Sequence, residues 1–428
     1  MTHLSRIDQR RIFKLVTLEE ASRRLQQALH TVRLDSEIVS VEKTRGRILA
    51  ETTVSHSDIP LTKMSAVDGY AVRSSETQDA SLKKPLKLKV KGELFPASTP
   101  GEFSLLPRCT AYLGCGAPVP DGADAVIRVE DTRRQGEELE VCRPIERNKN
   151  VILAGEDVKR GSTVLHEGRV LRPQDIGLLA ALRIREVKIV RKPRVAVLSV
   201  GDELTELKSD EQSKTINNYA LVVSAMALEF GAEAQVYGVV PDAVMKIAEK
   251  MEEALKANDI VVTIGGCSVG LKDFVPDAVN AIGNPGVIVH GIKISPGKVA
   301  GFGVVKGKPL VMLPGHIVST VAGFYLFVAP IIGLFIGQDV LRPLRVNAKV
   351  SGKVKAKPGI KTFLRVHVHR IKGSLVAEPI HGGSSSLSTI VGPNGFTIVK
   401  EGTNINKGDE ITVTLFSEQE LLQLQRMC

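Results

Sequence analysis

Residues that could do chemistry are concentrated in four short loops between predicted strands and helices of this 428-residue chain. The loop Gly265–Gly270 contains three glycines, which let backbone amides approach an anion closely, and the Ser268 hydroxyl is a further donor. Asp273 follows this loop, and an earlier loop, Gly201–Leu204, places two carboxylates after the first predicted strand. The pattern predicts a site for a phosphorylated ligand. A glycine-rich turn without a ligand is the alternative interpretation.

The other two loops carry groups suited to an oxyanion. Ser295-Pro296-Gly297-Lys298 combines a rigid turn with an ammonium group. Leu313-Pro314-Gly315-His316 ends a strand and opens a helix that contains Ser319, so free helix amides face the same edge. Ligands of open parallel sheets bind beyond the carboxyl ends of the strands. We therefore expect the four loops to converge on one ligand.

The elements that position these loops alternate regularly from residue 193 onward. Strands are predicted at 195–200, 234–240 and 260–264, and helices at 221–230 and 243–256, the second started by Asp242. Strands interleaved with helices of this length imply right-handed crossovers. The region is predicted to be an open, mainly parallel α/β sheet.

The rest of the chain predicts a multidomain protein of α/β and β parts. Thr17-Leu18-Glu19-Glu20 is a capping box that starts a helix with one apolar stripe. Short apolar runs separated by Pro, Gly and Asp indicate a β-rich second domain, and alternating runs after Pro343 indicate a small β barrel. We expect a helical linking domain of residues 1–53 and 159–192, a β-rich domain of 54–158, an α/β domain of 193–338 and a C-terminal β barrel of 339–428.

Composition narrows the class of protein. The five cysteines include no Cys-x-x-Cys pair and the N-terminus is charged before any apolar run, which together favour a cytoplasmic protein. The uncharged stretch Ile317–Ile336 is long enough to cross a bilayer, but Pro330, Gly323 and Gly333 interrupt it. We interpret it as a buried helix that continues past a proline break, and we expect no membrane contact.

The net charge of +10 equals the charge of one segment, Val340–Ala377, which carries ten Lys or Arg and no acid. We interpret it as a solvated face of the small β domain; the alternative is attraction of anionic substrates or of a polyanionic partner. Aromatic content of 4% without Trp disfavours stacking on nucleobases, so nucleic acid is not the expected partner. His367 and His369 are assigned to the basic face and not to a metal site.

The four loops, in this order, resemble those of the molybdopterin molybdenumtransferases, a family of molybdenum cofactor biosynthesis related to the C-terminal domain of gephyrin. The β-rich region adds family-like strings at 64–72 (MSAVDGYAV), 116–126 (GAPVPDGADAV) and 155–157 (GED). The resemblance runs from about Thr17 to the end of the sequence. It implies a homodimer whose cleft combines the central domain of one subunit with the β-rich domain of its partner. Contact with the enzyme that adenylylates molybdopterin is also expected.

By this resemblance, the reaction takes adenylylated molybdopterin and molybdate or tungstate, hydrolyses the adenylate and releases AMP. Mg²⁺ is the implied cofactor, because hard oxygen ligands hold a cation that polarises the bond to be broken. The implied catalytic residues are Asp273, Asp68, Glu203 and Asp242, of which Glu203, Asp242 and Asp273 are the metal ligands. The implied residues for the pterin and the oxyanion are Gly265, Gly266, Ser268, Gly270, Lys298, Pro314, Gly315, Ser319, Cys115, Asp157 and His316.

The chain departs from the family pattern on the oxyanion side. Cys115 replaces a Thr, His316-Ile317 replaces Asn-Pro, Ser295 replaces a Lys and Ile152 replaces an Arg. Three interpretations stay open: an active enzyme with an altered anion pocket, a paralogue that binds the pterin without turnover, and a binding module that uses the basic C-terminal segment. His316 is either an oxyanion ligand or a capping residue. Cys115 and Cys267 are interpreted as small buried residues and not as reactive thiols.

Overall fold

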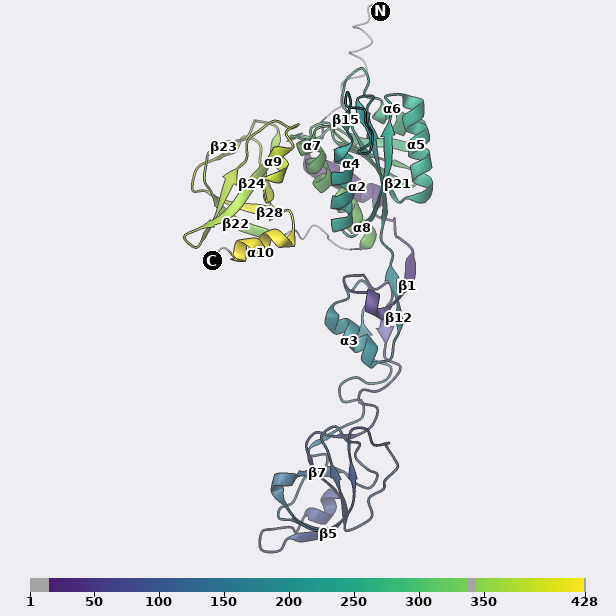
Figure 1. Ribbon diagram of the computed structural model, residues 1–428, viewed down its shortest axis with the longest axis vertical. Helices are drawn as coiled ribbons and strands as arrows, with labels where there is room; N and C mark the ends of the chain where they lie inside the picture. The colour runs from purple at the N-terminus through teal and green to yellow at the C-terminus, as the bar shows by residue number, and fades with distance from the viewer. Residues whose placement is uncertain (1–14, 338–343, 427–428) are drawn as a thin grey trace, which may run out of the picture. The chain divides into compact units, whose positions relative to one another are not determined.

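The computed structural model describes residues 15–337 and 344–426, and the chain forms two compact units (Figure 1). Unit 1 contains the chain up to Asp35 and from Arg191 onward, and unit 2 is Ser36–Val190. Unit 1 therefore holds the four loops singled out by their chemistry, whereas unit 2 holds Asp68, Cys115 and Asp157.

A six-stranded sheet forms the centre of unit 1. Its strand order is β16 (Glu233–Val240), β13 (Arg194–Val200), β17 (Ile260–Ile264), β21 (Lys308–Leu313), β20 (Gly301–Val305) and β18 (Pro285–His290). The first four strands are parallel, and β20 and β18 extend the sheet with antiparallel pairing. The predicted mainly parallel α/β sheet is confirmed, and the three predicted strands correspond to β13, β16 and β17.

Helices cover both faces of this sheet (Figure 1). They are α2 (Leu18–Leu29), α4 (Asn218–Glu229), α5 (Val244–Ala257), α6 (Val275–Ala281), α7 (Ile317–Gly323) and α8 (Ala329–Ile336). Val195 and Val197 of β13 pack in one core with α2, α4, α7 and α8, while the alternate residues Ala196, Leu198 and Val200 pack with α5 and α6. The twofold alternation of strand side chains thus builds two apolar layers and leaves the strand ends to the loops.

The uncharged stretch 317–336 is one helical segment inside this core. It runs from α7 through a π-helical turn, Phe324–Val328, into α8, with Pro330 in the first turn of α8. Within the described part of the chain it is the one helix apolar and long enough to span a bilayer, and 83% of its most apolar window is buried. Proline is tolerated where a helix begins, because its missing N–H is not needed there. The predicted buried helix is confirmed.

A closed barrel follows in unit 1. Its strands are β24 (Lys361–Ile371), β25 (Ser374–Pro379), β22 (Arg345–Val350), β28 (Glu410–Leu415) and β26 (Gly395–Val399), and β26 pairs back with β24. Smaller elements are β19 (Ile294–Ser295), β23 (Val354–Lys355), β27 (Asn404–Ile405), α9 (Ser388–Val391) and α10 (Glu418–Arg426). β19 pairs with β24, so the loop after β18 is joined to the barrel. The predicted C-terminal β barrel is confirmed.

The barrel divides the basic segment into buried and exposed positions. Arg365 is 5% exposed, and its guanidinium donates to Thr389 and to the carbonyl oxygen of Gly382. Burial lowers the pKa of Arg365. Lys353 and Lys355 are exposed, so the segment is not one uniform face. Its residues before 344 lie outside the described residues.

Unit 2 is built mainly of strands. Its six-stranded sheet runs β7 (Ala125–Arg128), β4 (Gly69–Val72), β6 (Cys109–Leu113), β5 (Leu86–Leu94), β9 (Glu138–Val141) and β8 (Thr132–Gln135). Short strands pair as β1 (Ser36–Ser40) with β12 (Glu186–Val190), β2 (Thr53–Val54) with β11 (Thr163–Leu165), and β3 (Met64–Ser65) with β10 (Val151–Ile152). Helix α3 spans Pro173–Ala181. The predicted β-rich second domain is confirmed.

Two predictions about helix starts need correction. Thr17 caps α2 and accepts from the N–H of Glu20 at 3.2 Å, but the Glu20 carboxylate pairs with two arginines of the helix and does not close a capping box. Asp242 does not cap α5, because Ala243 precedes the helix and the Asp242 carboxylate accepts from the N–H of Asp202 at 3.3 Å. The Asp242 side chain is thereby turned toward the loop that follows β13.

Candidate active site

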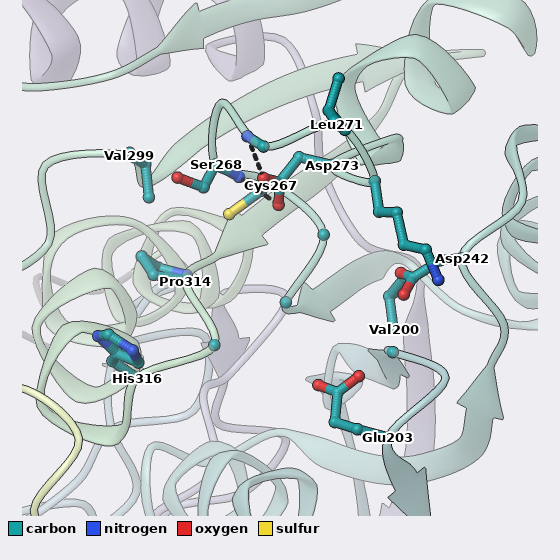
Figure 2. Close-up of a pocket in the computed structure, with 16 residues that line it drawn as sticks. Val200, Glu203, Asp242, Cys267, Ser268, Leu271, Asp273, Val299, Pro314 and His316 are labelled. Carbon is teal, nitrogen blue, oxygen red and sulfur yellow. Dashed lines mark hydrogen bonds between the residues drawn. The ribbon is translucent and has the colours of Figure 1, made fainter.

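A cavity of about 560 Å³ lies beyond the carboxyl ends of β13, β17 and β21 in unit 1 (Figure 2). The loops after these strands converge on it, as expected for an open parallel sheet. The predicted site residues that line it are Glu203, Asp242, Gly265, Gly266, Ser268, Gly270, Asp273, Pro314, Gly315 and His316. Three of the four predicted loops therefore meet at one place.

The loop Gly265–Gly270 leaves β17 in a conformation that favours glycine. Gly265 and Gly266 have positive φ angles of 87° and 62°, and a Cβ on Gly265 would stand 2.5 Å from the carbonyl oxygen of Val200. The N–H of Gly265 donates to the carbonyl oxygen of Leu313 at 3.0 Å, which ties the loop to β21. The glycines are thus required to bring this backbone to the cavity wall.

The carboxylate of Asp273 lies against the same loop. Its Oδ1 accepts from the N–H of Ser268 at 2.9 Å, and its Oδ2 accepts from the N–H of Gly270 at 2.5 Å (Figure 2). Motif comparison assigns the amides of this loop to a phosphate. In the structure, two of them bind a carboxylate of the chain itself, which the motif alone did not indicate.

Carboxylates also line the other side of the cavity, where Glu203 and Asp242 lie (Figure 2). Asp202 and Asp242 each accept from the backbone N–H of the other, at 3.2 and 3.3 Å. Burial raises the pKa of Asp242, and the negative charges of Asp202 and Glu203 raise it further. Lys272 pairs with Asp202 at 2.9 Å, which lowers the pKa of Asp202 and raises that of Lys272. Negative charge is therefore in excess here.

These carboxylates suit a hard divalent cation without forming a finished cage. Among the residues described, no group of three or more His, Cys, Asp or Glu side chains is arranged to hold a metal ion. Mg²⁺ keeps several of its waters and is usually held by one or two carboxylates together with substrate phosphates. Glu203, Asp242 and Asp273 line one cavity and supply such oxygens, so they fit a site completed by a phosphorylated ligand. The metal assignment stays a prediction.

His316 lies across the cavity from Asp242, at the start of α7 (Figure 2). It occupies the N-cap position, but its side chain makes no capping bond; its Nδ1 forms a 2.8 Å hydrogen bond with Ser384 Oγ. The carbonyl oxygen of Ser384 accepts from the N–H of Val318 at 3.0 Å and satisfies the helix start instead. Sequence reasoning missed Ser384, although the run Gly382–Ser386 of glycines and serines was a visible signal.

Two predicted residues of the oxyanion half do not line the cavity. Lys298 is exposed and adjoins Val299, which does line it. Ser319 is 6% exposed within α7. Neither side chain lines the cavity, and the role of both residues as ligands stays a prediction.

The two cysteines near the predicted site differ. Cys267 is 1% exposed, burial raises the pKa of its thiol, and its carbonyl oxygen accepts from His290 Nε2 at 2.7 Å. A neutral buried thiol is a packing residue, as expected. Cys115 in unit 2 is exposed, so the expectation that it is buried is wrong; it lies in the turn after β6, a surface position.

Unit 2 brings Asp68 and Cys115 together. The N–H of Cys115 donates to Asp68 Oδ1 at 2.8 Å, and its thiol lies 3.5 Å from the carbonyl oxygen of Ala66. Asp157 is bound through its backbone, whose N–H donates to the carbonyl oxygen of Ile59 at 3.0 Å. Asp68 and Asp157 are both exposed, so their carboxylates are accessible on the surface of unit 2.

Three family models match consecutive parts of the chain. Residues 16–182 match the MoeA N-terminal region (domain I and II), residues 196–333 match a probable molybdopterin binding domain, and residues 347–416 match the MoeA C-terminal region (domain IV). Together these matches cover both units, including the loops that line the cavity.

Similar proteins share nearly the whole length of the chain. A molybdopterin molybdenumtransferase of Bacillus subtilis (strain 168) is 30% identical over 392 residues, which cover 90% of this chain and 91% of the relative. One of Staphylococcus aureus (strain COL) is 33% identical over 391 residues, which cover 90% and 93%. The crystal structure of a molybdopterin biosynthesis MoeA protein from Pyrococcus horikosii is 32% identical with a TM-score of 0.83, and covers 94% of this chain and 100% of its own.

Proposed function

The chain belongs to the molybdopterin molybdenumtransferase family of molybdenum cofactor biosynthesis, and on that premise we propose that it inserts molybdate, or tungstate, into adenylylated molybdopterin with release of AMP. The observation that carries the proposal is the cavity at the end of the central sheet, where the amides of Gly265–Gly270 and the carboxylates of Glu203, Asp242 and Asp273 line one space. Cleaving a phosphate linkage needs both kinds of group.

The backbone amides of Gly265–Gly270 and the Ser268 hydroxyl bind the phosphate of the pterin. Pro314 and Gly315 form the wall beside this loop. His316 provides a donor for the oxyanion and compensates for the Lys and the Arg that the family pattern has where this chain has Ser295 and Ile152. Lys298 and the start of α7 near Ser319 add positive potential around the oxyanion. This division leaves the phosphate and the oxyanion on neighbouring parts of one cavity.

Glu203, Asp242 and Asp273 hold Mg²⁺ in this proposal. When bound, the cation polarises the linkage between the pterin phosphate and AMP and neutralises charge on the phosphate oxygens. The raised pKa of Asp242 supports the assignment, because the repulsion from Asp202 and Glu203 that contributes to it would be relieved by a cation.

Asp68, Cys115 and Asp157 act from the partner subunit of a cytoplasmic homodimer. The exposure of these side chains supports this assignment. Both carboxylates and the Cys115 thiol lie at the surface of unit 2, where a second subunit can reach them. Asp68 and Asp157 then face the metal or the incoming oxyanion. Delivery of the adenylylated pterin by the adenylylating enzyme would supply the substrate directly.

The test is a single-turnover reaction. Purified protein is mixed with adenylylated molybdopterin, Mg²⁺ and either molybdate or tungstate, and free AMP is followed by chromatography. We expect AMP in amounts that match the active sites, with the oxyanion that the altered pocket prefers giving the faster release. Tight binding of the pterin without AMP release would contradict the proposal and identify a non-catalytic paralogue.

A further inference from the structure

The amides of Ser268 and Gly270 form a pair that already holds an anion. Their N–H groups donate to the two carboxylate oxygens of Asp273, at 2.9 and 2.5 Å, so each oxygen has one donor (Figure 2). Hydrogen bonds from amides to a charged acceptor are roughly twice as strong as neutral ones. The amide pair is therefore strongly engaged within the chain.

The backbone around this amide pair is shaped for the close approach of an oxygen. A Cβ on Gly270 would stand 2.5 Å from Asp273 Oδ2, so any other residue would displace the carboxylate or shift the loop. Carboxylate and phosphate oxygens accept hydrogen bonds from such amides in the same way. The position of the Asp273 carboxylate is thus one that a phosphate oxygen could occupy.

Two other donors beside the amide pair are also engaged within the chain. The N–H of Gly265 is used by the carbonyl oxygen of Leu313. The Lys272 ammonium is paired with Asp202 at 2.9 Å. A phosphate that enters the cavity therefore meets a carboxylate on two of the amides assigned to it, and the two negative groups cannot share them.

We propose that Asp273 is a resident competitor of the phosphate: its carboxylate occupies the amide pair of Ser268 and Gly270 in the free protein, and the ligand phosphate displaces it. The displaced carboxylate then becomes available to the cation site beside Glu203 and Asp242. The inference rests on the proposed function, which assigns the loop to the ligand phosphate. It adds that binding of the phosphate is the step that releases the Asp273 carboxylate for the cation site.

Competition of this kind reduces apparent affinity, because only the fraction of protein with the amide pair free can bind. Removing Asp273 should therefore tighten the binding of a simple phosphate ligand, even though the same change abolishes the reaction. Loss of any negative charge in the cavity also helps an anion, so the control must carry the same charge change without the amide contact. Glu203→Gln provides it, because Glu203 lines the same cavity.

Binding of inorganic pyrophosphate to the full chain is measured by calorimetry without divalent cations, for wild type, Asp273→Ala, Asp273→Asn and Glu203→Gln. We expect about tenfold tighter binding for Asp273→Ala, set by the freed amide pair, and about threefold or less for Glu203→Gln, set by charge alone. Asp273→Asn keeps one acceptor oxygen and should fall between them. Unchanged or weaker binding by both Asp273 variants would overturn the inference and make the carboxylate a brace of the loop.

Amide resonances of Ser268 and Gly270 give a second readout that does not depend on the variants. In the wild type, pyrophosphate should shift both, because the acceptor changes from carboxylate to phosphate; binding that leaves both unmoved would also overturn the inference. The single-turnover assay separates this from the proposed function. If the wild type releases AMP but the Asp273 variants do not bind pyrophosphate more tightly, the inference about Asp273 is rejected and the proposed function stands. If the variants bind more tightly but the wild type releases no AMP, the proposed reaction is rejected and Asp273 is still a competitor for anions.

Discussion

At the scale of single residues, the cavity carries more negative charge than its lysine balances. Lys272 pairs with Asp202, whereas Glu203, Asp242 and Asp273 make no ion pair with a residue in the described ranges. Burial and its acidic neighbours raise the pKa of Asp242, so its ionised form is disfavoured at this position. A divalent cation is the simplest counter-charge, and under the proposed function the carboxylates should control how much Mg²⁺ is required for AMP release.

Glu203→Gln removes the charge of one proposed ligand and keeps its shape. We expect the Mg²⁺ concentration for half-maximal AMP release to rise by at least about tenfold, since a neutral amide is a poorer ligand for a hard cation. Chelation by EDTA should abolish release by the wild type, and added Mg²⁺ should restore it. Both are read from Mg²⁺ titrations of AMP release.

Glu206→Gln is the matched control, because Glu206 is an exposed glutamate that follows the same strand and does not line the cavity. Its Mg²⁺ requirement should equal that of the wild type. If Glu203→Gln also keeps the wild-type requirement, Glu203 is not a ligand.

Residue types were predictable from the sequence, but their hydrogen-bond partners were not. Glycines at 265 and 266 were predicted to bring backbone to a ligand, and the structure supplies the reason in their positive φ angles. The bonds from Ser268 and Gly270 to Asp273 depend on the path of the intervening residues, which no motif specifies. The contact of His316 with Ser384 joins positions 68 residues apart, so local pattern could not reveal it.

At the scale of elements, helix α3 of unit 2 begins with a buried carboxylate. Asp175 is 4% exposed, pairs with Arg169 at 2.8 Å and accepts from the N–H of Arg172 at 3.0 Å. The hydrogen bond with Arg169 is the main cause of a lowered pKa of Asp175, and the bonds with Arg172 lower this pKa further. Asp175→Asn should reduce the free energy of unfolding by about 1–3 kcal/mol at neutral pH, because a charged cap is lost and its arginines lose their partner. Urea unfolding measures the difference.

The same carboxylate predicts how that difference depends on pH. A group whose pKa is lower in the folded chain stabilises it above the unfolded pKa, about 3.9, and the contribution is lost as pH falls from there toward the folded pKa. The gap between wild type and Asp175→Asn should therefore be full at neutral pH and shrink below about pH 4. Asp79→Asn, at an exposed aspartate of the same unit, should show little gap at any pH. A gap that does not change with pH would rule out the ion pair as its cause.

The glycine of the DGYAV string is explained by packing between strands. A Cβ on Gly69 in β4 would clash with the carbonyl oxygen of Ile127 in β7. Gly69→Ala should destabilise unit 2 by about 1–3 kcal/mol, as overpacking does. Gly177→Ala in α3, where a Cβ meets nothing within 4 Å, should be neutral or stabilising by about 0.5–1 kcal/mol. Thermal unfolding that moves equally in both variants would contradict this account of Gly69.

The periodicity of the sequence predicted which segments are helices and which are strands, but it did not predict irregularities within them. The strand predicted at 260–264 is observed with those bounds, because its short β-branched run is flanked by Asn258-Asp259 and Gly265-Gly266. The π-helical turn Phe324–Val328 was not predictable, since a uniformly apolar stretch has no polar residues to mark the helix phase. Its position coincides with ring contacts of Phe324 and Tyr325 with Phe230 and of Tyr325 with Phe396, which belong to distant parts of the chain.

At the scale of the whole molecule, we propose a homodimer in which the site combines unit 1 of one subunit with unit 2 of its partner. Mixing two inactive variants tests this division. A heterodimer of Asp273→Asn and Asp68→Asn subunits has one site with both defects and one with none. We expect the mixed sample to recover about a quarter of wild-type AMP release, since about half of the dimers are heterodimers after subunit exchange.

The control mixes Asp273→Asn with Glu203→Gln, two changes in the same unit, at a Mg²⁺ concentration too low for Glu203→Gln to release AMP; every site is then defective and the mixture should recover nothing. Recovery in neither mixture, with subunit exchange verified, would place the whole site within one subunit. The sequence could not show whether the site lies within one subunit or is shared between two. Residues of unit 2 can contribute to the cavity of their own chain or to that of another copy, and no pattern along the sequence distinguishes these two arrangements.

The most direct test of the central claim is AMP release by Asp273→Asn, compared with Asp277→Asn. Both variants lose one carboxylate from the same stretch, but Asp277 is exposed in α6 and does not line the cavity. We expect Asp273→Asn to fold normally and to lose AMP release by at least about a hundredfold, while Asp277→Asn stays near wild type. Normal release by a well-folded Asp273→Asn protein would contradict the assignment of this cavity to the reaction.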